Sequence, residues 1–124
     1  MEVLASPSLW LDGMAGSLLP VAVAHGEGRA VFANPAAQQR FAAANLTGLR
    51  FALARGVAAE SYPANPNGSP RGLAAIGTPD GRVLAAMPHP ERVYRRIQNS
   101  WLPQRRGEDS GWMRVFRNAR RALA

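Results

Sequence analysis

One histidine of this chain has a proline on each side, in the run Met87-Pro-His-Pro-Glu-Arg92. This run constrains the local backbone more than any other feature of the sequence. Proline fixes φ near about −65°, lacks a backbone N–H and drives the residue before it towards extended geometry. The run therefore predicts an extended backbone, in which side chains two residues apart point to the same face. We expect the side chains of His89 and Glu91 to lie side by side.

A carboxylate beside an imidazole has a specific chemical use. It holds one ring nitrogen and leaves the other free to take and return a proton. His89 and Glu91 are therefore the candidate catalytic residues, as the base and the orienting group of a nucleophile–base–orienter triad. The alternative is a surface turn. The chain contains no cysteine, so a thiolate nucleophile would have to lie outside these 124 residues.

Composition limits the class of protein. A chain of 124 residues with 47% hydrophobic residues is one small domain or part of one. It has no apolar run of the roughly 20 residues needed to cross a bilayer and no secretory signal, so we expect no membrane partner and a cytoplasmic location. The lack of cysteine excludes a disulfide framework and cysteine-based zinc sites, and we expect no metal site.

The charge of this chain is carried entirely by arginine. The formal net charge is +7, and there is no lysine. Abundant Ala, Gly and Pro accompany the arginines, which indicates coding bias in a GC-rich genome. A phosphate-binding surface usually mixes lysine with arginine, so we expect no nucleic-acid partner. Nine of the fifteen arginines lie from Arg92 onward, where they form either a solvated helix face or a surface that docks on another domain.

Local patterns predict an α/β fold. Asn34-Pro35 is a helix start, with Asn as N-cap and Pro at the first helical position, and the helix is expected over residues 35–45. Thr78-Pro-Asp-Gly81 has type I turn chemistry and predicts a β-hairpin over residues 72–87. Further strands are expected from short apolar runs at residues 1–4, 18–24, 29–32, 49–53 and 57–62.

The C-terminal third is expected to hold two helices. Val93, Ile97 and Trp101 are spaced as one apolar face of a short helix. A polar loop over residues 102–111 follows. The final amphipathic helix is marked by Trp112, Val115, Phe116, Ala119 and Leu123, with Asp109 or Ser110 as its cap.

Two other polar segments are candidate sites. His25-Gly-Glu-Gly28 follows an apolar run, and His25 is interpreted as a structural histidine bonded to backbone, with Glu27 as a solvated turn residue. A phosphate-binding loop is disfavoured there because no lysine and no helix follow. The loop over residues 63–70 (Pro-Ala-Asn-Pro-Asn-Gly-Ser-Pro) either lines a small-molecule pocket or is a stiff connector.

Several of these motifs occur together in one order. They are Leu19-Pro-Val-Ala-Val-Ala-His-Gly-Glu-Gly-Arg29, Tyr62-Pro-Ala-Asn-Pro-Asn-Gly-Ser-Pro70, Met87-Pro-His-Pro-Glu-Arg-Val93, Asn99-Ser-Trp101 and Gly107-Glu-Asp-Ser110, followed by Trp112-Met-Arg-Val-Phe-Arg-Asn-Ala-Arg-Arg121. In this order they resemble the C-terminal end of the large single-chain phosphoribosylformylglycinamidine synthases. That end is a class I, or triad, glutamine amidotransferase domain, and the resemblance covers essentially the whole chain.

The resemblance implies a fold and a function. Residues 1–124 would be the C-terminal portion of a flavodoxin-like amidotransferase domain without its nucleophile-bearing half, and we expect a mixed sheet with a β-hairpin and C-terminal helices. His89 matches the triad histidine and Glu91 the triad glutamate. The domain would hydrolyse glutamine, and its ammonia would pass to a synthase portion of the same enzyme. That portion uses ATP and magnesium to make formylglycinamidine ribonucleotide; no cofactor is expected in this chain.

Three other interpretations remain open at this point. The chain is a non-catalytic module that docks through its arginine-rich helices, or one half of a split amidotransferase complemented in trans by a cysteine-bearing chain. The third, an RNA-binding domain, is disfavoured because the aromatic residues are placed as core residues and not as stacking platforms.

Overall fold

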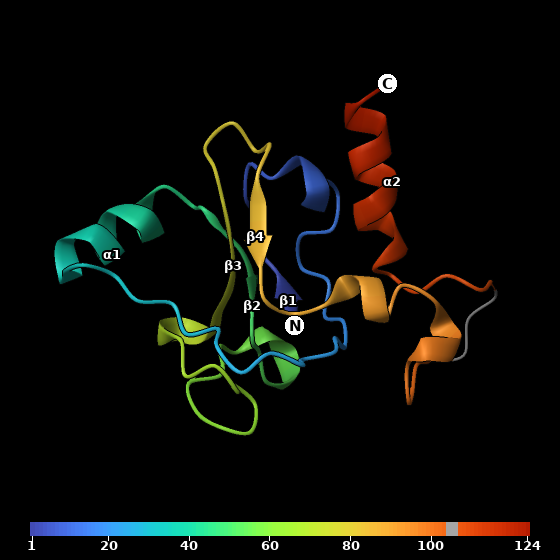
Figure 1. The fold of residues 1–124 in the computed structure, drawn as a ribbon, viewed down its shortest axis with the longest axis horizontal. Coiled ribbons are helices and arrows are strands. Elements are labelled where there is room, and N and C mark those ends of the chain that lie inside the picture. The colour runs from blue at the N-terminus through green and yellow to red at the C-terminus, as the bar shows by residue number, and fades with distance from the viewer. Residues whose placement is uncertain (104–106) are drawn as a thin grey trace.

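The computed structural model describes residues 1–103 and 107–124, and in these ranges four strands form one sheet. The strands are β1 (Glu2–Val3), β2 (Thr47–Arg50), β3 (Leu73–Gly77) and β4 (Leu84–Ala86), in the spatial order β1-β2-β3-β4 (Figure 1). The expected α/β class is confirmed. Every strand pair is antiparallel, where a mixed sheet was expected, because each connection returns the chain in the opposite direction along its neighbour.

The hairpin of β3 and β4 is confirmed, and local chemistry explains it. The Asp80 carboxylate accepts hydrogen bonds from the Thr78 hydroxyl at 2.5 Å and from the Arg82 N–H at 3.1 Å. Gly81 has φ +71° and its added Cβ would collide with the backbone at Pro7, so only glycine fits there. The register pairs Ala75 with Ala86, which carries the chain directly towards the predicted histidine.

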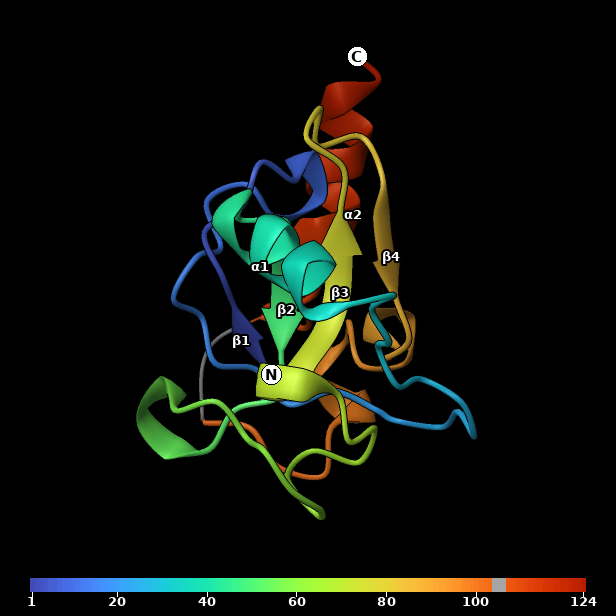
Figure 2. The same ribbon diagram turned by 90° about the vertical axis from the view of Figure 1, so that its left-hand side faces the viewer.

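Two α-helices lie on opposite faces of the sheet, as Figures 1 and 2 both show. Helix α1 (Pro35–Ala43) begins as expected, because the Asn34 side chain accepts a hydrogen bond from the Ala37 N–H at 2.9 Å. It ends two residues before the expected boundary and buries none of its side chains. The face of the sheet beneath α1 is therefore only loosely covered.

The hydrophobic core lies on the other face, under helix α2 (Met113–Ala122). The final helix is confirmed, but its expected cap at Asp109 or Ser110 is wrong, because Trp112 is the N-cap residue and no side chain caps the helix. Trp112, at the start of α2, is 1% exposed, and its indole N–H donates to the Pro20 carbonyl at 2.6 Å. The Ser110 hydroxyl accepts from the Trp112 N–H and so supports the turn into the helix. Trp112 packs in one cluster with buried side chains from the sheet and the N-terminal turns, including Val3, Leu11, Leu49 and Ala75.

The short helix expected around Val93, Ile97 and Trp101 is wrong. The chain forms two 3₁₀ turns, Pro90–Arg92 and Arg96–Gln98, and leaves Ile97 91% exposed. Side chains form hydrogen bonds with the main-chain N–H and C=O groups that would otherwise bond to one another in a helix. The Asn99 amide donates to the carbonyls of Val93 and Arg95, and the Gln98 side-chain oxygen accepts from the Arg95 N–H.

Three of the expected strands are also wrong. Residues 18–24 and 57–62 make only isolated bridges, and residues 29–32 are not a strand. Pro20, which has no N–H, interrupts the first of these segments, and the Ala30 N–H is taken by the Ser69 hydroxyl instead of a strand partner. The strand expected over residues 49–53 runs over Thr47–Arg50. The expected loop over residues 102–111 includes 104–106, which lie outside the described residues.

Candidate functional site

The predicted pair of residues meets directly after β4. From Ala86 the chain passes through Met87 and Pro88, and the His89 N–H donates to the Ala22 carbonyl at 2.9 Å. The His89 Nδ1–H then donates to Oε1 of Glu91 at 2.6 Å. The structure thus brings together the two side chains that the sequence paired, and their catalytic role stays a prediction.

The backbone achieves this pairing differently from the prediction. His89 itself is not helical (φ −108°, ψ 82°), as expected for a residue before proline. Glu91, however, lies in the 3₁₀ turn Pro90–Arg92 and not in extended chain. Proline is well tolerated at the first position of a helical turn, where its missing N–H needs no partner. The tight turn folds the carboxylate back towards the imidazole.

The electrostatics favour an ionised Glu91. Desolvation alone would raise the pKa of its carboxyl. Hydrogen bonds from its own backbone N–H and from His89, with the electrostatic attraction of His89 and of the Arg92 guanidinium, outweigh this and lower the pKa below its usual value. The ionised carboxylate only accepts hydrogen bonds, so Nδ1 of His89 carries a proton. In the neutral ring Nε2 is then an acceptor, and it has no hydrogen-bond partner among the described residues. The side chains of His89 and Glu91 remain 28% and 56% exposed.

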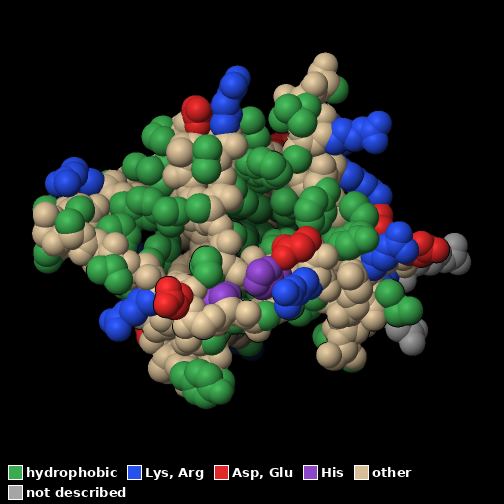
Figure 3. All heavy atoms as spheres, in the orientation of Figure 1, with side chains coloured by type: hydrophobic (Ala, Val, Ile, Leu, Met, Phe, Trp, Pro, Cys, Tyr) green, Lys and Arg blue, Asp and Glu red, His purple; other side chains and the backbone are tan. Residues whose placement is uncertain are grey.

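A second histidine joins the site, which the sequence did not predict. The rings of His25 and His89 lie 6.3 Å apart between centroids, tilted by 50°, and Figure 3 shows the two histidines side by side on one face of the molecule. His25 was expected to bond to backbone. Its Nε2 instead bonds to the side-chain oxygen of Asn67 at 2.7 Å. Glu27 is exposed, which fits a solvated turn residue.

The asparagine-rich loop over residues 63–70 organises this corner of the molecule. Asn65, 1% exposed, donates through Nδ2 to the carbonyls of Ala59 and Ser69. Ser69, also 1% exposed, donates to the Gly28 carbonyl through its hydroxyl. The loop is therefore a stiff connector that is hydrogen-bonded to the segment carrying His25. The cluster of Asn and Ser between prolines was the available signal in the sequence, although it did not identify Asn67 as a partner of His25.

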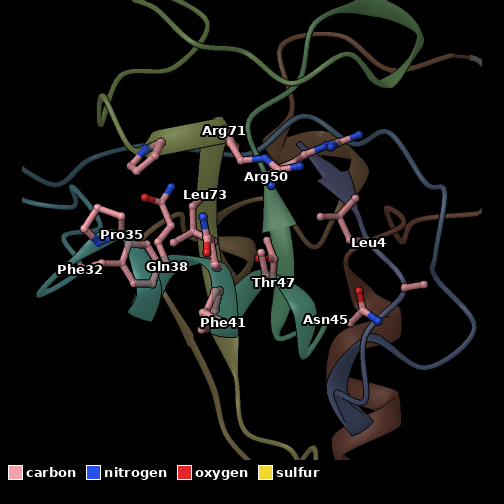
Figure 4. A pocket seen from close by; sticks show the side chains of 14 residues that line it. Leu4, Phe32, Pro35, Gln38, Phe41, Asn45, Thr47, Arg50, Arg71 and Leu73 are labelled. Atoms are coloured by element: carbon pink, nitrogen blue, oxygen red, sulfur yellow. The ribbon is translucent and has the colours of Figure 1, made fainter.

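A separate cavity of about 620 Å³ lies between α1 and the sheet. It is lined by Phe32, Phe41 and Leu73, with Arg50 and Arg71 at one end (Figure 4). Neither His89 nor Glu91 lines it. Arg50 is engaged by Glu2 at 2.5 Å and by the Gly56 carbonyl. The histidine–glutamate pair is thus an open surface site, separate from this cavity.

Two further features of the described residues bear on the class of site. No group of three or more His, Asp or Glu side chains gathers there as a set of metal ligands. Within the same ranges, no helix has the length and apolar character needed to span a membrane.

Comparison with known protein families identifies the family of this chain. A family model described as a CobB/CobQ-like glutamine amidotransferase domain matches residues 1–122. The chain belongs to this amidotransferase family. The match extends from β1 to the last turn of α2, so it includes the histidine–glutamate pair, the asparagine-rich loop and the hairpin that connects them.

Membership of the glutamine amidotransferase family supports a glutamine-hydrolysing role. A hydrogen-bonded imidazole and carboxylate fit the proton-transfer part of such a reaction. The amidotransferase chain has no cysteine among its 124 residues, so no thiol of its own stands opposite His89.

Proposed function

We propose that this chain supplies the general base and its orienting carboxylate to a glutamine amidotransferase that provides ammonia for phosphoribosylformylglycinamidine synthesis. The observation that carries the proposal is the 2.6 Å bond between His89 Nδ1 and Glu91, which leaves Nε2 of the same ring free for proton transfer.

The reaction follows from these two groups. His89 Nε2 takes the proton of a thiol, and the thiolate attacks the side-chain amide carbon of glutamine. His89 then returns the proton to the departing nitrogen, which leaves as ammonia. A water molecule, deprotonated by the same Nε2, cleaves the acyl intermediate to glutamate. Throughout, Glu91 keeps the imidazole in the Nδ1–H tautomer and stabilises the imidazolium that forms.

The thiol comes from polypeptide outside the 124 residues. It belongs either to the same enzyme or to a separate cysteine-bearing chain that assembles with this one. The site suits such assembly, since the side chains of both His89 and Glu91 are partly exposed on one face of the molecule.

The synthase is proposed from the run of motifs between Leu19 and Arg121. In this proposal glutamine is the substrate of the amidotransferase portion. A synthase portion of the same cytoplasmic enzyme consumes the ammonia, with ATP and magnesium, as a ligase of purine biosynthesis.

The test uses the intact synthase with its cysteine-bearing region. His89→Ala is expected to abolish glutamine-dependent synthesis while synthesis from free ammonia continues, because only the glutamine half-reaction needs the base. Glu91→Gln is expected to lower glutamine-dependent turnover by about 10²- to 10⁴-fold, the usual contribution of a positioned acid–base group. Glu108→Gln, a change at an exposed carboxylate, is the matched control and is expected to have no effect. Full glutamine-dependent turnover in His89→Ala contradicts the proposal.

The docking module is the second candidate. Arg114, Arg117, Arg120 and Arg121 are all exposed along α2, which favours a basic docking surface. If His89→Ala leaves glutamine use unchanged while charge reversal on α2 releases the chain from its assembly, the docking function replaces the catalytic one.

A further inference from the structure

We infer that His25 is a positioning residue for His89, an imidazole anchored by Asn67 that holds the base in its Glu91-bonded orientation. The inference rests on the proposed function of His89, and it adds a residue that acts on the base and not on the substrate.

The anchoring of His25 is specific. Asn67 Nδ2 donates to the Gly28 carbonyl at 3.0 Å, which fixes the orientation of its amide because a carbonyl only accepts. Asn67 Oδ1 therefore faces His25 as an acceptor, and His25 must donate from Nε2–H. His25 and His89 thus hold opposite tautomers, Nε2–H in the first and Nδ1–H in the second.

The second ring nitrogen of His25, Nδ1, indicates that this residue does not contact substrate. Its Nδ1 is buried and has no hydrogen-bond partner among the described residues. A nitrogen closed off in this way is not available to a substrate. The ring contact with His89, at a centroid distance typical of aromatic pairs, is the route by which His25 reaches the site.

The base needs such support. A histidine–carboxylate pair that is 28% and 56% exposed contributes little on its own, because solvent screens the attraction and both side chains retain rotational freedom. Catalytic groups must be held within about 0.5 Å and about 10–20° of the productive geometry. His25 is bonded to Asn67 in the loop over residues 63–70, and the main chain of His89 is bonded to Ala22, three residues before His25. Hydrogen bonds thus fix the His25 ring and hold the main chain of His89 against the segment that carries His25.

The test reads the tautomers directly in the 124-residue chain. The chain has only two histidines, so imidazole ¹⁵N shifts are unambiguous, and in His25→Ala every such signal belongs to His89. We expect the ratio of Nδ1–H to Nε2–H tautomer of His89 to fall roughly fivefold, as for the loss of about 1 kcal/mol of support. Asn67→Ala, which removes only the anchor, is expected to lower the ratio in the same direction.

Asn118→Ala is the matched control. It removes a buried asparagine whose Nδ2, like that of Asn67, donates to main-chain carbonyls, here those of Trp10 and Asp12. It is expected to lower stability and leave the His89 tautomer ratio unchanged. An unchanged ratio in a folded His25→Ala chain overturns the inference. If that variant does not fold, an unchanged ratio in Asn67→Ala overturns it.

A kinetic readout separates the inference from the proposed function. In the intact synthase, His25→Ala is expected to lower kcat for glutamine and to leave KM for glutamine and the ammonia-dependent rate unchanged. If His89→Ala retains full glutamine use, the proposed function fails whatever the ¹⁵N spectra show. If His89 proves essential but its tautomer is indifferent to His25 and Asn67, only the positioning role fails.

Discussion

Replacing Gly28 with alanine tests whether the backbone beneath His25 has room for a side chain. A Cβ at this position would lie 2.6 Å from Nε2 of His25 and 2.9 Å from Nδ2 of Asn67, closer than real carbon contacts allow. Gly26, two residues earlier in the same turn, has nothing within 4 Å of the equivalent position. Neither glycine has the left-handed φ that would strain an alanine.

The expected changes in the free energy of unfolding have opposite signs. In Gly28→Ala the two side chains must move apart, which costs about 1 kcal/mol for the His25–Asn67 hydrogen bond and about 1–3 kcal/mol of overpacking. The displaced groups are ends of side chains, so the lower part of this range applies. A less flexible unfolded chain returns about 0.4–1 kcal/mol, and the net loss is about 1–2 kcal/mol. Gly26→Ala has only the gain, about 0.4–1 kcal/mol.

Urea unfolding followed by tryptophan fluorescence measures both variants, and equal m-values show that the unfolding transition is the same in each. The Gly28→Ala chain is expected to unfold at lower urea than wild type and the Gly26→Ala chain at higher urea. A Gly28→Ala protein at least as stable as Gly26→Ala refutes the reasoning, because it means that His25 and Asn67 do not pack over Gly28.

Three further predictions concern acid sensitivity and the core. The pKa of Asp80 is lowered, mainly by the hydrogen bond from the Thr78 hydroxyl. The ionised Asp80 therefore stabilises the fold above its unfolded pKa, and this contribution is lost as pH falls through the lowered pKa. Asp80→Asn is expected to flatten the acid side of a plot of urea midpoint against pH. The pKa of Glu91 is also lowered, so its ¹³C carboxyl signal is expected to titrate below the usual range for glutamate, and a titration at or above that range contradicts the pairing. Trp112→Phe leaves the Pro20 carbonyl without its indole donor and is expected to cost about 2 kcal/mol in urea unfolding; a change below about 0.5 kcal/mol contradicts this role.

Local chemistry was enough to predict several elements. Asn34 and Pro35 specify the start of α1 within a few residues of chain, and the turn ending at Gly81 specifies the β3–β4 hairpin. His89 and Glu91 are only two residues apart, so their contact required no knowledge of the tertiary structure. The path of the backbone was less predictable, because proline is compatible both with extended chain and with the first position of a 3₁₀ turn.

Hydrogen bonds that the periodicity does not reveal explain the errors. Residues 18–24 are apolar enough for a strand, yet they are divided between a bridge to Glu2 at one end and a bridge to His89 at the other. The i, i+4 spacing from Val93 to Trp101 matches a helix, but Asn99 turns back onto the carbonyls of that same segment. Nothing in the spacing reveals that a side-chain amide will bond to these main-chain carbonyls.

Residue identity and near neighbours along the chain were enough to predict the His89–Glu91 pair, the hairpin that leads to it and the lack of a thiol. The position of His25 beside His89, and its bond to Asn67, 42 residues away, became known from the folded structure alone. Such contacts depend on how distant loops pack together. Asn65 bonds within its own loop to the carbonyls of Ala59 and Ser69, and the Ser69 hydroxyl joins that loop to the Gly28 carbonyl.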